Sequence, residues 1–196
     1  MAAKAKTARA AVAPAAPMIF AFRGVRVFQV ILVLIALVTG VGAVLLARSV
    51  ADGAGSLLLL PGIVLLFVFG WSFMGALRAP TSFVAITEER TRIRFAGFVD
   101  TVIASRDITS ARAVQWNILG GIGIRPNFAG KVALVTATGP AVELSLANPI
   151  RVSVIPGILR VKANRLTLSV KNPQRMVERF ARQDGRHTSL KDSHEA

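Results

Sequence analysis

The sequence predicts a two-helix transmembrane hairpin followed by an α+β, mainly β domain of about seven antiparallel strands and a C-terminal helix. Three observations support this fold class. Two uncharged apolar runs occupy positions 27–47 and 57–77, short segments of alternating apolar and polar residues follow between 82 and 170, and helical periodicity begins after Pro173. Because 53% of the 196 residues are hydrophobic while 17% are charged, a membrane part joined to a water-exposed part fits the composition.

Both apolar runs have the length of a membrane span. The run from Val27 to Ala47 has 21 residues and no charge, and as a helix it would rise about 31 Å, the thickness of a bilayer core. The run from Leu57 to Leu77 has the same length, and Pro61 falls in its first turn, where a missing donor costs little. Cleavage of the first run as a signal peptide is the alternative, but apolar signal cores have only about 7 to 15 residues.

Basic residues are distributed unevenly around the two runs. Five Lys and Arg precede the first run, Arg48 alone lies between the runs, and 18 follow the second. Positive charge is retained on the cytoplasmic side, so the pattern predicts a multi-pass protein with both termini in the cytoplasm. Arg outnumbers Lys 18 to 6 beside abundant Ala, Gly and Val, residues with GC-rich codons, which is typical of a bacterium with a GC-rich genome. The expected location is therefore the bacterial inner membrane.

Small residues recur along one face of the first predicted helix. Ala36, Gly40, Ala43 and Ala47 follow a spacing of i, i+4, i+7 and i+11. Such a face lets another helix approach closely. We expect it to receive the second helix of the hairpin, and the alternative is a separate partner or a second copy of the chain.

The chain divides into four parts. Residues 1–19 are expected to form a disordered basic arm, 20–78 the hairpin, 79–183 the β domain, and 184–196 a disordered tail. Strands are predicted near 82–87, 90–95, 98–104, 111–116, 131–137, 141–146 and 165–170. Asn172 and Pro173 are typical of a helix start, and Met176, Val177 and Phe180 then fall on one helix face.

The element order and several segments resemble a known family. The segments are Gly121–Arg125, Val132–Val135, Val142–Leu144 and Arg165–Val170 followed by Asn172-Pro173. Over roughly residues 82–182 they resemble bacterial pleckstrin-homology-like (PH-like) domains attached to membrane helices. The resemblance implies two curved antiparallel sheets with the helix plugging one end. It also implies a cytoplasmic binding or scaffolding module beside a membrane.

No constellation of reactive groups predicts catalysis. The β domain contains no His and no Cys, and its carboxylates do not match the spacing of an acid–base pair or of a metal site. Gly121 and Gly123 begin a dinucleotide fingerprint, but position 126 is Pro and no helix is expected to follow. We therefore predict no enzyme activity, no catalytic residue, no cofactor and no metal.

The positive charge instead predicts contact with anionic surfaces. The chain carries a formal net charge of +14, and alternation along 90–95 places three arginines on one strand face. The predicted contacts with anionic phospholipid or an acidic partner are Arg90, Arg92, Arg94, Arg125, Arg151, Arg160 and Lys162. For the three strand arginines the alternative is solvated protection of an edge strand. Nucleic acid is not favoured, since the aromatic and basic interleaving of single-strand binders is missing.

Two segments leave alternatives open. The glycine-rich stretch 119–126 is expected to be an interstrand loop with Trp116 at its base, and its functional variant brings Trp116 and Arg125 to a lipid or a partner protein. The segment 149–162 mixes apolar and basic residues around Pro156. It is expected to form another strand or fill the core, and its alternative is insertion at the membrane surface.

These observations favour a non-catalytic binding or scaffolding module anchored at the cytoplasmic leaflet. The alternative is an accessory subunit or assembly factor of a larger membrane complex. The expected partners are the lipid bilayer, with anionic phospholipid, and another membrane protein or a second copy of the chain.

Overall fold

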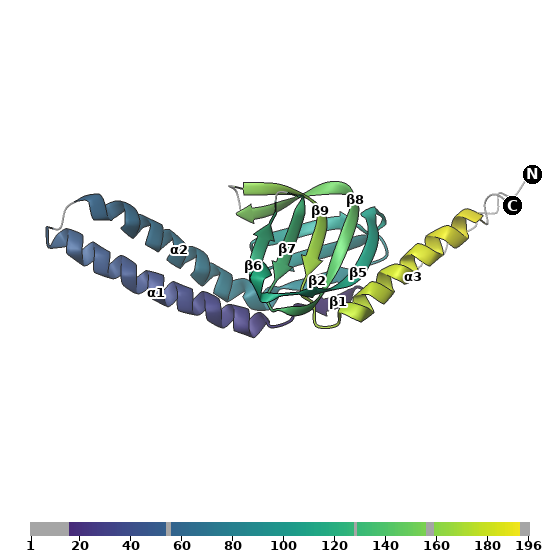
Figure 1. Ribbon diagram of the computed structural model, residues 1–196, viewed down its shortest axis with the longest axis horizontal. Helices are drawn as coiled ribbons and strands as arrows, with labels where there is room; N and C mark the ends of the chain where they lie inside the picture. The colour runs from purple at the N-terminus through teal and green to yellow at the C-terminus, as the bar shows by residue number, and fades with distance from the viewer. Residues whose placement is uncertain (1–15, 54–55, 128, 156–158, 193–196) are drawn as a thin grey trace, which may run out of the picture.

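A computed structural model describes residues 16–53, 56–127, 129–155 and 159–192, and the side chains of residues 184–192 are outside this description. Two long helices project from one side of a β domain, and a third helix leaves the other side (Figure 1). The predicted order of two apolar helices, a mainly β domain and a C-terminal helix is confirmed.

The two N-terminal helices are α1, Val25–Ala51, and α2, Leu59–Arg78, which the 3-10 turn η1, Ser56–Leu58, precedes. Both are long and apolar enough to cross a membrane. Helix α1 extends past both ends of the predicted run 27–47, through Arg26 and Arg48, whereas α2 begins two residues after the predicted start at 57 and continues one residue past the predicted end, to Arg78. Helical hydrogen bonding does not stop where side chains become charged.

A four-stranded antiparallel sheet has the order β1-β2-β3-β4. Its strands are β1 Met18–Ala21, β2 Phe83–Ile86, β3 Arg90–Phe95 and β4 Val99–Ala104. The strand β1 corrects the sequence analysis, which assigned positions 18 and 19 to a disordered arm and the next two to the hairpin. Four residues carry too little pattern to reveal a strand, and its partner β2 lies some sixty residues along the chain. Residues 1–15 of the predicted arm lie outside the described residues.

The second sheet has five strands in the order β5-β8-β9-β7-β6. They are β5 Ile108–Trp116, β6 Gly123–Pro126, β7 Lys131–Val135, β8 Gly139–Ile155 and β9 Leu159–Leu168. The prediction of about seven antiparallel strands is wrong on two counts: the described residues form nine strands, and β7 pairs with β9 in parallel. Hydrophobic alternation identifies individual strands. Whether two strands pair in parallel or antiparallel depends on the path of the chain that connects them.

The segment 149–162 belongs to this sheet. Its described residues form the outer part of the β8–β9 hairpin, in which Ile150 pairs with Ala163 and Val152 with Val161. Val152 and Ala163 are fully buried, so the expectation of a strand against the core is confirmed. Residues 156–158 lie outside the described residues.

The hydrophobic core lies between the two sheets and continues into α1. Phe95 is fully buried at its centre, with ring centroids 5.2 Å from Phe22 and 5.6 Å from Phe28, the latter on α1. The helix α3, Pro173–Asp192, begins where predicted and buries Met176 and Phe180 against the same core. Its backbone continues nine residues beyond the predicted limit at 183. Once the first half of a helix is fixed by packing, further turns can be added without an apolar pattern in the sequence.

Gly24 joins the β domain to α1 within a single residue. It has φ 70°, and a Cβ built on it would lie 2.6 Å from the Cβ of Ala137. Immediately before this turn Arg23 is hydrogen bonded to the residues that follow β9 and β7, since its amide donates to the Ser169 carbonyl at 2.8 Å and its carbonyl accepts from the Thr136 hydroxyl. The first helix is thus attached directly to the sheet.

Candidate functional site

The outer face of the five-stranded sheet gathers basic side chains by cross-strand pairing. Partners in adjacent strands project to the same side of a sheet. One row across all five strands runs through Arg112, Glu143, Thr167, Ala133 and Arg125. Two arginines from the two edge strands therefore flank a row of smaller side chains.

The next row adds two further cations and two hydroxyls. It runs through Ser110 on β5, Ser145 on β8, Arg165 on β9 and Lys131 on β7. Arg165 is exposed and Lys131 is half-buried. The parallel β7–β9 pairing is what brings these two cations together, since they are 34 positions apart in the chain.

The outer part of the β8–β9 hairpin extends this surface. Arg151 pairs with Lys162, and Ser153 with Arg160, while the alternate positions Val152 and Ala163 face the core. The three cations are therefore on the side away from the core. We call the surface formed by the seven cations the basic face; its members are Arg112, Arg125, Lys131, Arg151, Arg160, Lys162 and Arg165.

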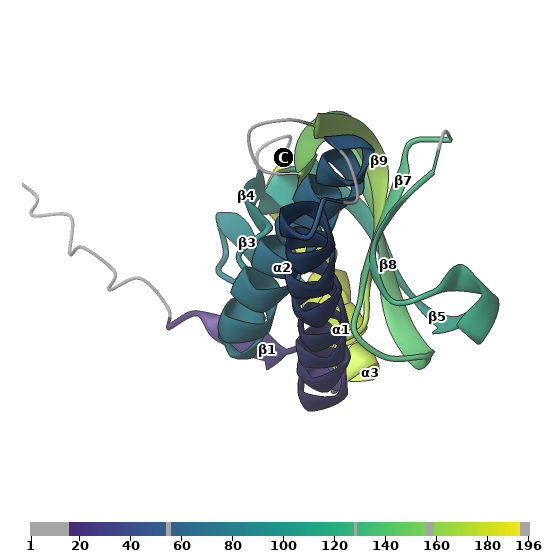
Figure 2. The same cartoon turned by 90° about the vertical axis from the view of Figure 1, so that its left-hand side faces the viewer.

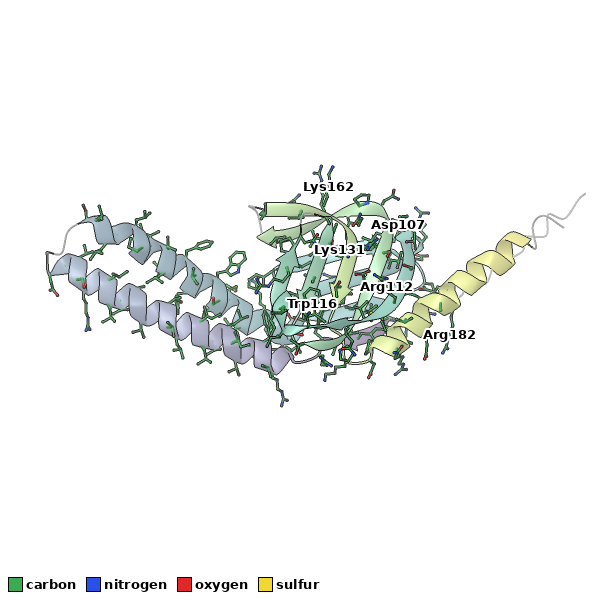
Figure 3. The ribbon with its side chains drawn as sticks, viewed as in Figure 1. Asp107, Arg112, Trp116, Lys131, Lys162 and Arg182 are labelled. Atoms are coloured by element: carbon green, nitrogen blue, oxygen red, sulfur yellow. The ribbon has the colours of Figure 1, made fainter. Side chains whose placement is uncertain are left out.

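The floor of the basic face is made of small, shielded side chains. Val135 and Ala141 have no exposed surface, and Ala133 and Thr167 are about one-twentieth exposed. Figure 3 shows the labelled side chains of Arg112 and Lys131 over the sheet face turned to the viewer, and that of Lys162 at the upper end of the β8–β9 hairpin. Long basic side chains around small neutral ones leave room for a ligand chain between the cations.

Glu143 is the single carboxylate on these paired positions of the basic face. Its side chain is 9% exposed, and its Oε1 accepts hydrogen bonds from Arg112 Nε at 3.0 Å and Arg112 Nη2 at 2.5 Å. This ion pair neutralises one arginine and holds it against the sheet. The other six cations have no carboxylate among the ion pairs found in the described part of the chain.

Of the stretch 119–126, predicted to be an interstrand loop, residues 123–126 form β6 and the rest belong to the loop that joins β5 to β6. Trp116 and Arg125 both contact this loop. The indole Nε1 of Trp116 donates to the Gly121 carbonyl at 2.9 Å. A Cβ built on Gly121 would lie 2.7 Å from Arg125 Nη2, so the guanidinium lies against the loop backbone. The loop and Arg125 together form the edge of the basic face nearest β6.

Arg90, Arg92 and Arg94 lie on β3 in the other sheet, remote from the basic face. Alternate residues of β3 are fully buried, so the predicted division into an apolar and a basic strand face is confirmed. Arg92 forms a two-bonded ion pair with Asp100, at 2.9 and 2.7 Å. The hydrogen bond from Arg92 lowers the pKa of the Asp100 carboxyl, and Arg94 adds to this effect. Part of the positive charge on this face is therefore offset within the protein.

Of the seven cations predicted to meet an anionic partner, four belong to the basic face. Sequence reasoning missed Arg112, Lys131 and Arg165. Arg112 and Arg165 lie in predicted strands, so their alternating pattern could have placed them on a strand face. That they share one sheet face depends on the strand order, which the pattern does not contain. Among the described residues no group of three His, Cys, Asp or Glu side chains is placed to hold a metal ion.

The small-residue face of α1 lies toward α2. Ala36 is 3% exposed, and a Cβ on Gly40 would be 3.1 Å from the ring of Phe69. Farther from the β domain, Ala43 and Ala47 line a groove between the two helices of about 830 Å³, which also includes Ala36 and Gly40. The second helix thus packs on one part of the predicted face and leaves another part open.

Comparisons with protein-family models, with curated proteins and with solved structures found no match to this chain. The resemblance to PH-like domains accordingly rests on the sequence pattern described above.

Proposed function

We propose that this chain is a non-catalytic, membrane-anchored scaffolding module that holds an acidic segment of a neighbouring membrane protein on its basic face. The observation that carries the proposal is the convergence of seven cations around one paired carboxylate on a single sheet face. In this proposal α1 and α2 cross the inner membrane, both termini are cytoplasmic, and the β domain is a PH-like domain.

Exposure along the helices supports the membrane anchor. Val38 on α1 is 72% exposed, and Leu60 and Ile63 on α2 are 71% and 63% exposed. Apolar surface of this extent around two adjacent helices is unfavourable in water, whereas hydrocarbon accommodates it. Arg48, in the last turn of α1, is the single basic residue near the connection between the helices, and the many basic residues after α2 favour a cytoplasmic β domain.

The orientation of the basic face favours a protein partner over the bilayer itself. In Figure 1 the helices lie in the plane of the picture and the outer face of the five-stranded sheet is turned to the viewer. In Figure 2, seen from the helix side, this sheet stands edge-on at one side of the helices. If the helices cross a membrane, the basic face is directed parallel to the bilayer plane and not toward the lipid. A neighbouring membrane protein would lie in that direction.

The experiment compares two triple substitutions in the full chain, reconstituted in neutral phosphatidylcholine nanodiscs. One variant carries Arg125→Gln, Lys131→Gln and Arg165→Gln; the control carries Arg90→Gln, Arg92→Gln and Arg94→Gln, the same charge change on β3 of the other sheet. The probe is a fluorescent polyglutamate peptide. Three exposed ion pairs of about 0.2–1 kcal/mol each predict a loss of affinity of about tenfold for the first variant at low salt.

The control variant is expected to lose less than threefold, since only non-specific attraction changes. Equal losses in both variants would show that net charge alone attracts the peptide, and the proposal would be abandoned. If the first variant instead binds polyglutamate normally but loses attraction to phosphatidylglycerol nanodiscs, the ligand of the basic face is the lipid headgroup.

A second function, accessory subunit of a membrane complex, is favoured by the groove between α1 and α2. Its lining is apolar with small residues on one side, a surface suited to a partner transmembrane helix. The change Ala43→Phe would fill the groove. We expect it to abolish recovery of a stoichiometric partner on purification in mild detergent, while the first triple variant above would leave that recovery intact.

A further inference from the structure

We propose that the loop between β5 and β6 inserts Ile118 and Leu119 into the surface of the bilayer that α1 and α2 cross. This inference rests on the membrane anchoring proposed above, and it concerns the uncharged tip of the loop at the edge of the basic face, which contains none of the seven cations. Ile118 is 78% exposed and Leu119 is 91% exposed. They are adjacent, and the neighbouring residues from Asn117 to Ile122 carry no charge.

The loop holds these two side chains outward by its own hydrogen bonds. Ile118–Gly120 form the 3-10 turn η4, whose start is capped by the Asn117 side chain, which accepts from the Gly120 amide at 3.0 Å. Trp116 donates to the Gly121 carbonyl, and its indole fills the space where a Cβ of Gly120 would lie, at 2.5 Å. The Trp side chain thus supports the turn from beneath.

The loop emerges at the end of the sheet from which α1 begins. Trp116 pairs with Gly139, and a Cβ on Gly139 would be 2.5 Å from the guanidinium of Arg23, two residues before α1. On the other side of the loop Gly123 pairs with Val135, next to the residues that pack on Gly24. Figure 3 shows Trp116 on the side of the β domain that carries the helices.

A separate contact shows how close the β domain sits to the apolar span. Phe98, the last residue of the β3–β4 turn, stacks on Trp71 of α2 with ring centroids 4.8 Å apart and planes 4° apart. Trp71 lies seven residues before Arg78, about 10 Å along the helix, and the residues between are uncharged. A β-domain side chain therefore reaches the apolar part of α2, and the edge of the domain must meet the headgroup region.

These observations identify the bilayer as the occupant of the exposed pair. Two apolar side chains at this level can be buried about 5–10 Å into the boundary of headgroups and acyl chains, as in other interfacial anchors. Phe98 and the loop then contact the membrane at two separate places beside the helices. Contact at two places fixes the orientation of the β domain relative to the membrane, and therefore the direction in which the basic face points.

The test uses single cysteines, since the native chain has none. Leu119→Cys is labelled with an environment-sensitive fluorophore in the full chain, reconstituted in vesicles of phosphatidylcholine and phosphatidylglycerol. Ala129→Cys, an exposed position at the opposite end of the β6–β7 pair, is the surface control, and Val38→Cys in the middle of α1 is the membrane control. Each is quenched with lipids that carry a nitroxide at a shallow or a deep acyl position.

We expect shallow nitroxide to quench the label at 119 several-fold more than the label at 129, and deep nitroxide to quench the label at 38 most strongly. A label at 119 that behaves like the one at 129, while the label at 38 is quenched, would overturn the inference and leave the anchoring intact. A label at 38 that no nitroxide lipid quenches would show that the anchoring, and with it the proposed function, has failed.

Discussion

The substitution Gly24→Ala tests the direct attachment of α1 to the β domain. Gly24 has φ 70°, a conformation that costs an ordinary L-residue about 1–2 kcal/mol. The added Cβ would also lie 2.6 Å from the Cβ of Ala137, well inside a normal carbon contact of about 3.5–4.0 Å. Overpacking of this kind costs about 1–3 kcal/mol, so we expect a total destabilisation of about 3 kcal/mol.

The assay is thermal unfolding of the full chain in mild detergent, followed by the fluorescence of Trp71, which stacks on Phe98 of the β domain, and of Trp116 at the end of β5. At about 2–4 °C per kcal/mol for a chain of this size, Gly24→Ala should lower the Tm by about 6–12 °C. The change Ala137→Gly removes the opposing Cβ. The double variant should therefore regain the steric cost of about 1–3 kcal/mol. It should retain the destabilisation caused by the left-handed backbone conformation of Ala at position 24.

Ala137→Gly alone is the control and is expected to cost no more than about 1 kcal/mol. A Tm for Gly24→Ala within 1–2 °C of wild type would refute the close approach at the junction. Failure of Ala137→Gly to restore any stability to Gly24→Ala would refute the steric part of the reasoning.

Three further predictions follow from charge and topology. In intact cells an impermeant thiol reagent should label Ser56→Cys between the helices but not Ala129→Cys in the β domain; the reverse result would invert the topology. Arg112→Ala should destabilise by about 1–3 kcal/mol by leaving the shielded Glu143 carboxylate unpaired, and adding Glu143→Gln should recover most of this loss in the same thermal assay. The depressed pKa of Asp100 means that its ion pair stabilises the fold above the ordinary carboxyl pKa of about 3.9 and that this contribution is lost as pH falls through the folded value. Asp100→Asn should therefore flatten the acid side of the Tm-against-pH curve, with a change near neutral pH of about 1 °C because the pair is exposed.

Long, strongly patterned segments were the predictable part of the fold. Two uncharged runs predicted α1 and α2, and the alternation of Thr91, Ile93 and Phe95 with arginines predicted β3 and its two faces. The start of α3 at Pro173 also followed from its local signals. In each case the signal is contained in a few consecutive residues and reports local geometry directly.

Short or glycine-rich strands were not predictable in the same way. Four residues in β1 and four in β6 show little alternation, and both strands are defined by their partners. The parallel direction of β7 and β9 is likewise a property of the return path of the chain. The sequence pattern likewise contains no sign that Arg92 of β3 pairs with Asp100 of β4, an ion pair that offsets part of the positive charge of β3.

The sequence by itself determined that this protein has two apolar helices, a basic β domain and a C-terminal helix, because periodicity and charge act over neighbouring residues. Only the tertiary structure decided which cations share a face. Arg112, Arg125 and Arg165 lie on one face across the strand order β5-β8-β9-β7-β6, and that order is set by packing both sheets on one core. Side-chain positions on adjacent strands depend on register and direction, which are non-local quantities that no window of sequence contains.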